Sequence, residues 1–140
     1  MECEVNWMSQ VGMAFSAKTT SGHLVNMDVA PESGGHNLAP SPMEMVLLGT
    51  GGCTAYDVVT ILKKSRQDIT GCSVKLTAER ANEDPRVFTK IQFHFTVTGK
   101  NLNSATVERA INLSHNKYCS ASVMLSHTAA LSHSFEIIEN

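Results

Sequence analysis

The sequence predicts an α+β fold in a single domain, because strand-type alternation at both ends of the chain brackets one long apolar helical segment. A length of 140 residues is typical of one domain, and we place that domain over residues 1–140. Hydrophobic residues make up 42% of the chain and charged residues 17%, which favours a globular protein over a disordered one.

The first thirty residues have the pattern of short strands. Cys3, Val5 and Trp7 alternate with polar residues, which places them on one face of a first strand. Runs over 13–19 and 24–29 follow, each separated from its neighbour by a glycine-containing turn. We therefore expect a three-stranded meander.

A long helix should begin at Ser41-Pro42-Met43-Glu44, which is a capping box with Ser41 at the N-cap and Glu44 at N3. We expect it to run to about Arg66. Residues 45–55 carry no charge on any face, which predicts burial on all sides. Glycines at 49, 51 and 52 are costly inside a helix, so they predict the close approach of another backbone.

The second half of the chain predicts a hairpin, a helical segment and a last strand. Alternation over 72–79 and 90–98 indicates two strands, and the polar residues 81–85 join them as a hairpin turn. Asn103 is the expected N-cap of a second helix, and a short further helix should cover about 118–125. The run 134–138 reads as the last strand.

Charge and hydropathy exclude several classes of function. The net charge is −2 and lysines and arginines do not cluster, so we expect no nucleic-acid partner. The first residues lack the pattern of a signal peptide, and the charge-free apolar stretch at 45–56 is too short to cross a bilayer. We expect no membrane partner and a cytoplasmic location.

The cysteines are the main candidates for chemistry. Cys53 lies in the middle of the apolar helix and Cys119 at the end of a helical element; each is either a small buried hydrophobe or part of a thiol site. The mid-helix position of Cys53 gives no help from a helix N-terminus, so activation has to come from elsewhere in the fold. Cys3 and Cys72 are expected on inner strand faces, where packing explains them.

Other chemistries find little support. None of the six histidines pairs at metal-binding spacing, so we expect no metal. The glycines at 49–52 lack the Lys-Ser/Thr of a phosphate loop, and the nucleophile motif G-x-S-x-G is absent. We expect no cofactor.

The run from Ala39 through Cys53 to Val59 resembles the OsmC/Ohr family of osmotically inducible and organic hydroperoxide resistance proteins. Segments 85–91 and 117–120, the order of elements and the second helix agree with this family. The resemblance covers nearly the whole chain, and the YhfA-like branch is the part of the family that it most resembles.

The resemblance implies an intertwined homodimer in which long central helices pack together and the two cysteines meet near the interface. Cys53 would attack an organic hydroperoxide to give an alcohol and a sulfenic acid, and Cys119 would resolve this as a disulfide. An external thiol would then reduce the disulfide. Glu44 is the third candidate catalytic residue, although its capping role is sufficient to explain it.

The chain departs from the family pattern at two points. The family's catalytic glutamate directly follows the helix-start proline, where this chain has Met43. The family's N-terminal arginine is also missing, since no arginine precedes Arg66; Arg80 or Arg86 is a possible substitute.

Two hypotheses follow. The first is a thiol-dependent peroxidase for organic hydroperoxides, with an apolar pocket formed by Met43, Leu47, Leu48 and the facing subunit. The second is a non-enzymatic protein of the same fold that binds an apolar ligand or senses redox state through a disulfide. The cysteines favour the first, and the altered glutamate and arginine positions favour the second.

Overall fold

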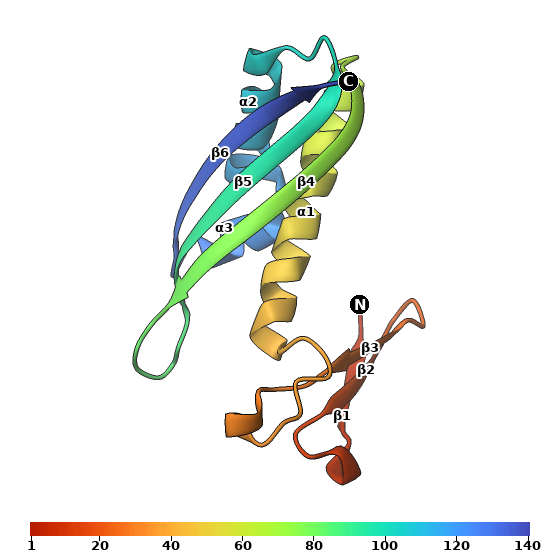
Figure 1. Cartoon of the computed structure of the whole chain (residues 1–140), viewed down its shortest axis with the longest axis vertical. Helices are drawn as coiled ribbons and strands as arrows, with labels where there is room; N and C mark the ends of the chain where they lie inside the picture. The colour runs from red at the N-terminus through yellow and green to blue at the C-terminus, as the bar shows by residue number, and fades with distance from the viewer. The chain divides into compact units, whose positions relative to one another are not determined.

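The computed structural model describes residues 1–140, with strands toward both ends of the chain and one long helix between them (Figure 1). The chain forms two units, Met1–Leu48 and Gly49–Asn140, and the boundary between them falls within that helix. The α+β class predicted from the sequence is confirmed.

The first unit contains the predicted meander. Strands β1 (Cys3–Trp7), β2 (Phe15–Thr19) and β3 (Leu24–Met27) pair antiparallel in the order β1-β2-β3. Short 3-10 turns, η1 (Ser9–Val11) and η2 (Pro31–Ser33), lie in the connections. Every residue of β1 is exposed, so the expectation that Cys3 lies on an inner face is wrong.

Asp28 organises the loop that leads to the long helix. Its buried carboxylate accepts hydrogen bonds from the backbone N–H groups of Val29, His36 and Leu38 at 2.8, 3.1 and 3.1 Å. These bonds, led by the one from Leu38, hold the pKa of the carboxyl below its usual value. One side chain thus holds three backbone N–H groups of a loop whose only regular turn is the short η2.

Helix α1 (Pro42–Lys64) begins as the capping box predicts. The Ser41 N–H donates to the Glu44 carboxylate at 2.7 Å, and the Glu44 N–H donates to the Ser41 hydroxyl at 3.3 Å. The helix ends at Lys64, two residues before the expected Arg66, because Arg66 adopts a left-handed conformation with φ of 57°.

The burial expected on all sides of α1 is wrong for the single chain. Its buried residues lie on one face, and they are Thr50, Gly51, Thr54, Val58 and Leu62. On other faces Leu48 is 61% exposed and Tyr56 is 71% exposed. By length and hydropathy α1 could cross a membrane, but the core helix of a soluble protein has the same two properties.

The second unit contains a three-stranded sheet in the order β4-β5-β6. Strands β4 (Asp68–Arg80) and β5 (Phe88–Lys100) form the predicted hairpin. Strand β6 (Ala130–Glu139) is longer than the predicted 134–138 and pairs parallel to β5, from Lys90 opposite Ala130 to Gly99 opposite Glu139. Parallel pairing requires a crossover connection, which the intervening helices supply.

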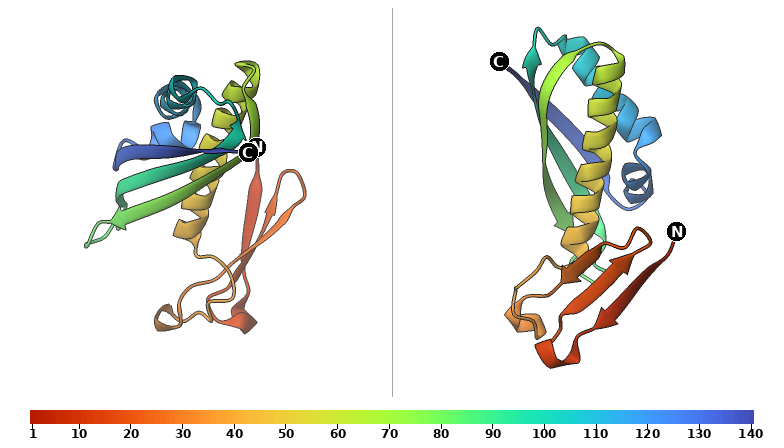
Figure 2. Two further views of the ribbon diagram at one scale, coloured as in Figure 1. Left: turned by 45° about the horizontal axis from the view of Figure 1, so that its top comes forward. Right: turned by 90° about the vertical axis from the view of Figure 1, so that its right-hand side faces the viewer.

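That crossover consists of α2 (Ser104–Leu113), a π-helical turn η3 (Ser114–Tyr118) and α3 (Ser120–Leu125). Asn103 caps α2 as predicted, with its side chain accepting from the Thr106 N–H at 2.9 Å. In this unit the helices lie against one face of the sheet (Figure 2). They cover a core centred on the inward face of β5, made of Phe88, Ile91, Phe93, Phe95 and Val97.

Candidate functional site

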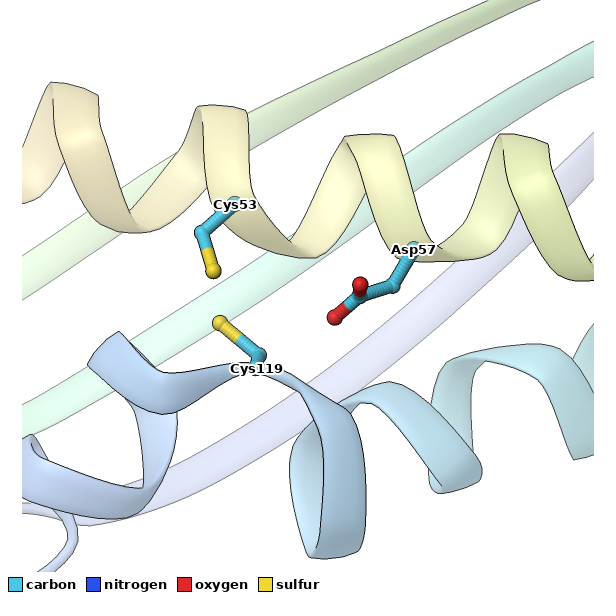
Figure 3. A group of neighbouring side chains, drawn as sticks. All are labelled: Cys53, Asp57 and Cys119. Carbon is cyan, nitrogen blue, oxygen red and sulfur yellow. The ribbon is translucent and has the colours of Figure 1, made fainter.

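The second unit brings together Cys53, Asp57 and Cys119 (Figure 3). Cys53 and Asp57 stand four residues apart on α1, so they share one face of the helix. Cys119 approaches from the junction of η3 and α3. The two sulfurs and a carboxylate oxygen all lie within 4.8 Å of one another, and both thiols are free. We call these three residues the cysteine–aspartate cluster.

The π-helical turn before Cys119 sets the position of its sulfur. The Cys119 N–H donates to the Ser114 carbonyl at 2.8 Å, which closes the turn. Cys119 is then the N-cap of α3, where its sulfur accepts from the Ser122 N–H at 3.4 Å. Turns of this kind are rare, occur mostly as single turns within α-helices, and are frequent at functional sites. The sequence predicts the short helix found here, α3, but not the π turn before it.

The two cysteines differ in their exposure to solvent. Cys119 is completely buried, whereas Cys53 is half-buried. Burial raises the pKa of the Cys119 thiol, and this effect outweighs the hydrogen bond from Ser122, which acts in the opposite direction. A reagent that reaches the cluster from solvent therefore meets Cys53 first.

Asp57 is held in place by a chain of two hydroxyl groups. The Ser114 hydroxyl donates to the Asp57 carboxylate at 3.0 Å. Ser114 has only one proton to donate, so the Thr54 hydroxyl, 2.9 Å away, donates to Ser114. The result is a fixed carboxylate beside two sulfurs, and a carboxylate in that place repels negative charge on a neighbouring thiolate.

Asp57 is a site residue that the sequence alone does not predict. The signal that could have found it is the spacing of four residues from Cys53 on a predicted helix. Asp57 also lines a pocket of about 430 Å³ whose other walls are mostly apolar or aromatic, with Tyr56, Ile61, Leu113 and Tyr118 among them. The cluster is therefore adjacent to a cavity large enough for a small organic molecule.

Glu44, the third candidate catalytic residue, lies in the first unit and is engaged in the helix cap. Its hydrogen bonds with Ser41, the backbone N–H first, hold the pKa of the exposed carboxyl below its usual value. The helix cap alone therefore accounts for the hydrogen bonds of Glu44, and no substrate is needed to explain this residue.

The two arginines considered as substitutes for the missing one lie at the end of the β4–β5 hairpin. The Arg80 guanidinium donates to the Arg86 carbonyl at 2.8 Å, and the Arg86 guanidinium donates to the Ala81 carbonyl at 3.3 Å. Both guanidinium groups are therefore engaged at the hairpin tip in the single chain.

Comparison with known proteins agrees with this architecture. The family model described as OsmC-like protein matches residues 35–134. The protein YhfA of Escherichia coli strain K12 is 49% identical over 138 residues, which cover 99% of this chain and 98% of YhfA.

Two solved structures illustrate the likeness of fold. A protein of Aquifex aeolicus VF5 matches with a TM-score of 0.84 and 27% identity, covering 99% of this chain and 96% of that one. An organic hydroperoxide resistance protein of Legionella pneumophila matches with a TM-score of 0.74 and 16% identity, covering 96% and 95% of the two chains. The chain therefore belongs to the family of OsmC-like proteins.

Proposed function

We propose that this protein is a thiol-dependent peroxidase that reduces organic hydroperoxides. The Cys53 sulfur attacks the hydroperoxide and becomes a sulfenic acid, while the substrate leaves as an alcohol. The Cys119 thiol then attacks the Cys53 sulfur and releases water as the disulfide forms. Two equivalents of an external thiol restore the dithiol and leave as their own disulfide.

The observation that carries this proposal is the pairing of an accessible and a buried cysteine in one cluster. Cys53 is the thiol that a hydroperoxide reaches, and Cys119 stands behind it with its sulfur within 4.8 Å. A sulfenic acid at Cys53 would then meet its resolving thiol before a second oxidant molecule. The apolar walls of the adjacent pocket suit the alkyl or aryl group of an organic hydroperoxide.

The family relationship supports the same reaction class. The Legionella pneumophila protein, which shares this fold, is named for organic hydroperoxide resistance. By analogy we propose a role in defence against oxidative stress. Free thiols at all four cysteines suit a reducing compartment, and we propose that the protein acts in the cytoplasm.

We also propose that the chain works as a homodimer. The sheet of the first unit has no apolar core of its own: Val5, Trp7 and Leu24 are exposed, and Ala14 is the one buried apolar side chain of that unit. A three-stranded sheet needs a packed apolar face to be stable. A second copy would supply that cover and complete the single domain that we expect over residues 1–140.

The dimer can be tested by sedimentation velocity on the wild type and on Leu48→Lys, which places a charge on an exposed apolar position of α1. We expect a dimer for the wild type and a shift toward monomer for the variant. Thr77→Lys, on the exposed face of β4, is the matched control and should remain dimeric.

A second candidate function is redox sensing or the binding of an apolar ligand without catalysis. It is favoured by Asp57, since a carboxylate beside the two sulfurs opposes the thiolate that attacks a peroxide. Met43 also favours sensing or binding without catalysis, because it occupies the position of the family's catalytic glutamate at the helix start. Under this hypothesis the disulfide forms slowly and is the signal rather than an intermediate.

The deciding experiment is consumption of cumene hydroperoxide or tert-butyl hydroperoxide with a dithiol reductant and a metal chelator present. The peroxidase predicts turnover that Cys53→Ser abolishes. Cys119→Ser, assayed after the reductant has been removed, should consume one equivalent of hydroperoxide and stop at the sulfenic acid. Cys72→Ser, which changes a half-buried cysteine on β4, is the matched control and should retain turnover. Full turnover in Cys53→Ser would refute the proposal, and no turnover in a folded wild type would favour sensing or binding.

Glu44→Gln tests the remaining candidate residue. Glutamine preserves the capping box, so the helix should remain intact while the negative charge is lost. A lower rate of turnover with unchanged helicity by circular dichroism would support a catalytic role. An unchanged rate would leave Glu44 as a capping residue only.

A further inference from the structure

We propose that the cysteine–aspartate cluster, when both thiols are reduced, is a binding site for Zn²⁺. Three potential ligand atoms, the sulfurs of Cys53 and Cys119 and a carboxylate oxygen of Asp57, converge within 4.8 Å of one another. They come from two separate elements, α1 and the start of α3, that face each other (Figure 3). This inference requires two reduced cysteines in proximity but does not require the peroxidase reaction.

The chemistry of the three groups favours zinc. Thiolates select soft or borderline metals, and Zn²⁺ combines cysteine sulfur with aspartate oxygen in tetrahedral sites. Bonds of about 2.3 Å to sulfur and 2.0–2.2 Å to oxygen place tetrahedral ligands roughly 3.5–3.8 Å apart. Side-chain rotations that move the ligand atoms about 1 Å closer together would bring the cluster to that spacing. A fourth coordination position would remain for a solvent molecule.

Hydrogen bonds from neighbouring residues hold two of the three potential ligands, Asp57 and Cys119, in place. The Ser114 hydroxyl donates to Asp57, and the Ser122 N–H donates to the Cys119 sulfur. Donors of this kind orient the ligands in metal sites and are part of their affinity. Zn²⁺ would offset two of the three negative charges that the carboxylate and two thiolates would carry together, and one negative charge would remain.

Zinc and the disulfide are mutually exclusive states of this cluster. Binding releases the two thiol protons, and the metal then occupies the electron pairs that a disulfide or an attack on a hydroperoxide would use. Oxidation of both sulfurs to the disulfide by a hydroperoxide, which accepts the two electrons and two protons and becomes an alcohol and water, leaves one carboxylate as a ligand and releases the ion. The metal would therefore protect the thiols and hold the protein in its reduced form.

Zinc binding can be measured on the full chain, reduced and stripped of metal by a chelator, by competition with a chromophoric zinc indicator. We expect one Zn²⁺ per chain. Cys53→Ser and Cys119→Ser should each weaken binding by at least the ~10–100-fold that loss of an outer partner costs a metal site. Asp57→Asn should also weaken it. Cys72→Ser is the matched control and should bind as the wild type does.

Two measurements on the wild type test the zinc site without relying on variants, which could fail to fold. Co²⁺ in place of zinc should give intense thiolate-to-metal charge-transfer absorption together with the visible bands of a tetrahedral site. Zinc should also protect Cys53 and Cys119, but not the exposed Cys3, from alkylation.

The outcomes separate this proposal from the peroxidase. No zinc binding by the reduced wild type, or equal binding by Cys53→Ser, would overturn the zinc site and leave the peroxidase assay unaffected, since that assay contains a chelator. Conversely, stoichiometric zinc binding lost in both cysteine variants supports the site even where no hydroperoxide is consumed.

Discussion

The Ser114 hydroxyl donates a 3.0 Å hydrogen bond to the Asp57 carboxylate, and so ties the π-helical turn to α1 directly beside the two cysteines. Ser114 is buried and receives a hydrogen bond from Thr54 in turn. This hydrogen bond therefore fixes the Asp57 side chain and also holds η3 against α1.

Ser114→Ala should lower the free energy of unfolding by about 1–3 kcal/mol, because the part-buried carboxylate loses a donor and Thr54 loses its acceptor. Urea unfolding followed by circular dichroism measures the change. Ser126→Ala removes an exposed hydroxyl that donates to the Val123 carbonyl, and it should change stability by less than about 0.5 kcal/mol. Equal effects of the two substitutions would contradict this account of Ser114.

The reactivity of the cysteines should follow their burial. Burial raises the pKa of the Cys119 thiol, so less thiolate is present at a given pH, and the sulfur is also shielded from reagent. Alkylation by iodoacetamide, read by mass spectrometry after digestion, should modify the exposed Cys3 well before Cys119. The rate at Cys119 should continue to rise above the pH at which an ordinary thiol is already ionised. Modification of Cys119 as fast as Cys3 in the native protein would contradict this prediction.

Much of the fold was predictable because it depends on local pattern. The capping box at Ser41, the cap at Asn103 and the alternating strands are each encoded by neighbouring residues, and all are confirmed. The parallel pairing of β5 and β6 was not predictable, since alternation shows which face of a strand is buried but not which strand it joins. Likewise, β6 begins at Ala130 rather than at residue 134 because Ala130 pairs with Lys90 of β5, and the sequence of β6 alone does not show that pairing.

The candidate site was only partly predictable for the same reason. The family resemblance is what singles out Cys53 and Cys119 as a pair, because local pattern alone leaves each as either a small buried residue or part of a thiol site. Asp57 was missed, since its role depends on the approach of a segment some sixty residues further along the chain. Spacing along the sequence cannot reveal two cysteines and an aspartate that only the π turn at 114–118 brings together.

A pH-dependent contribution to stability is expected from His115. This side chain packs edge-on against Phe93 and stacks on His133, and neither ring nitrogen has a hydrogen-bond partner in the protein. Burial, with a smaller effect of His133, lowers the pKa of His115 from 6.5 to about 4. Between these two values the unfolded chain holds a proton that the folded chain does not, so the free energy of unfolding should fall as the pH is lowered through this range.

His115→Phe should remove part of that dependence, because phenylalanine fits an aromatic cluster and cannot titrate. We expect a shallower fall in the urea midpoint from pH 6.5 to 4 than in the wild type. His127→Phe, at an exposed position, is the matched control and should keep the wild-type slope. The assignment would be contradicted by identical slopes for His115→Phe and wild type.

Gly51 and Gly52 are adjacent on α1 but face different surroundings. A Cβ added at Gly51 would lie 2.7 Å from the Leu76 Cδ1 atom, whereas one added at Gly52 meets nothing within 4 Å in the single chain. Alanine in place of glycine inside a helix stabilises by about 1 kcal/mol where space allows. Gly52→Ala should therefore gain about this amount, and Gly51→Ala should gain less because Leu76 has to move.

Urea unfolding of the two alanine variants measures this difference, and sedimentation velocity on the same samples reports the assembly. A larger gain for Gly51→Ala than for Gly52→Ala would contradict the contact with Leu76. A loss of stability in Gly52→Ala, together with a smaller fraction of dimer, would contradict open space at that position. It would instead place the second copy against Gly52, since a glycine on an exposed helix face leaves room for another backbone.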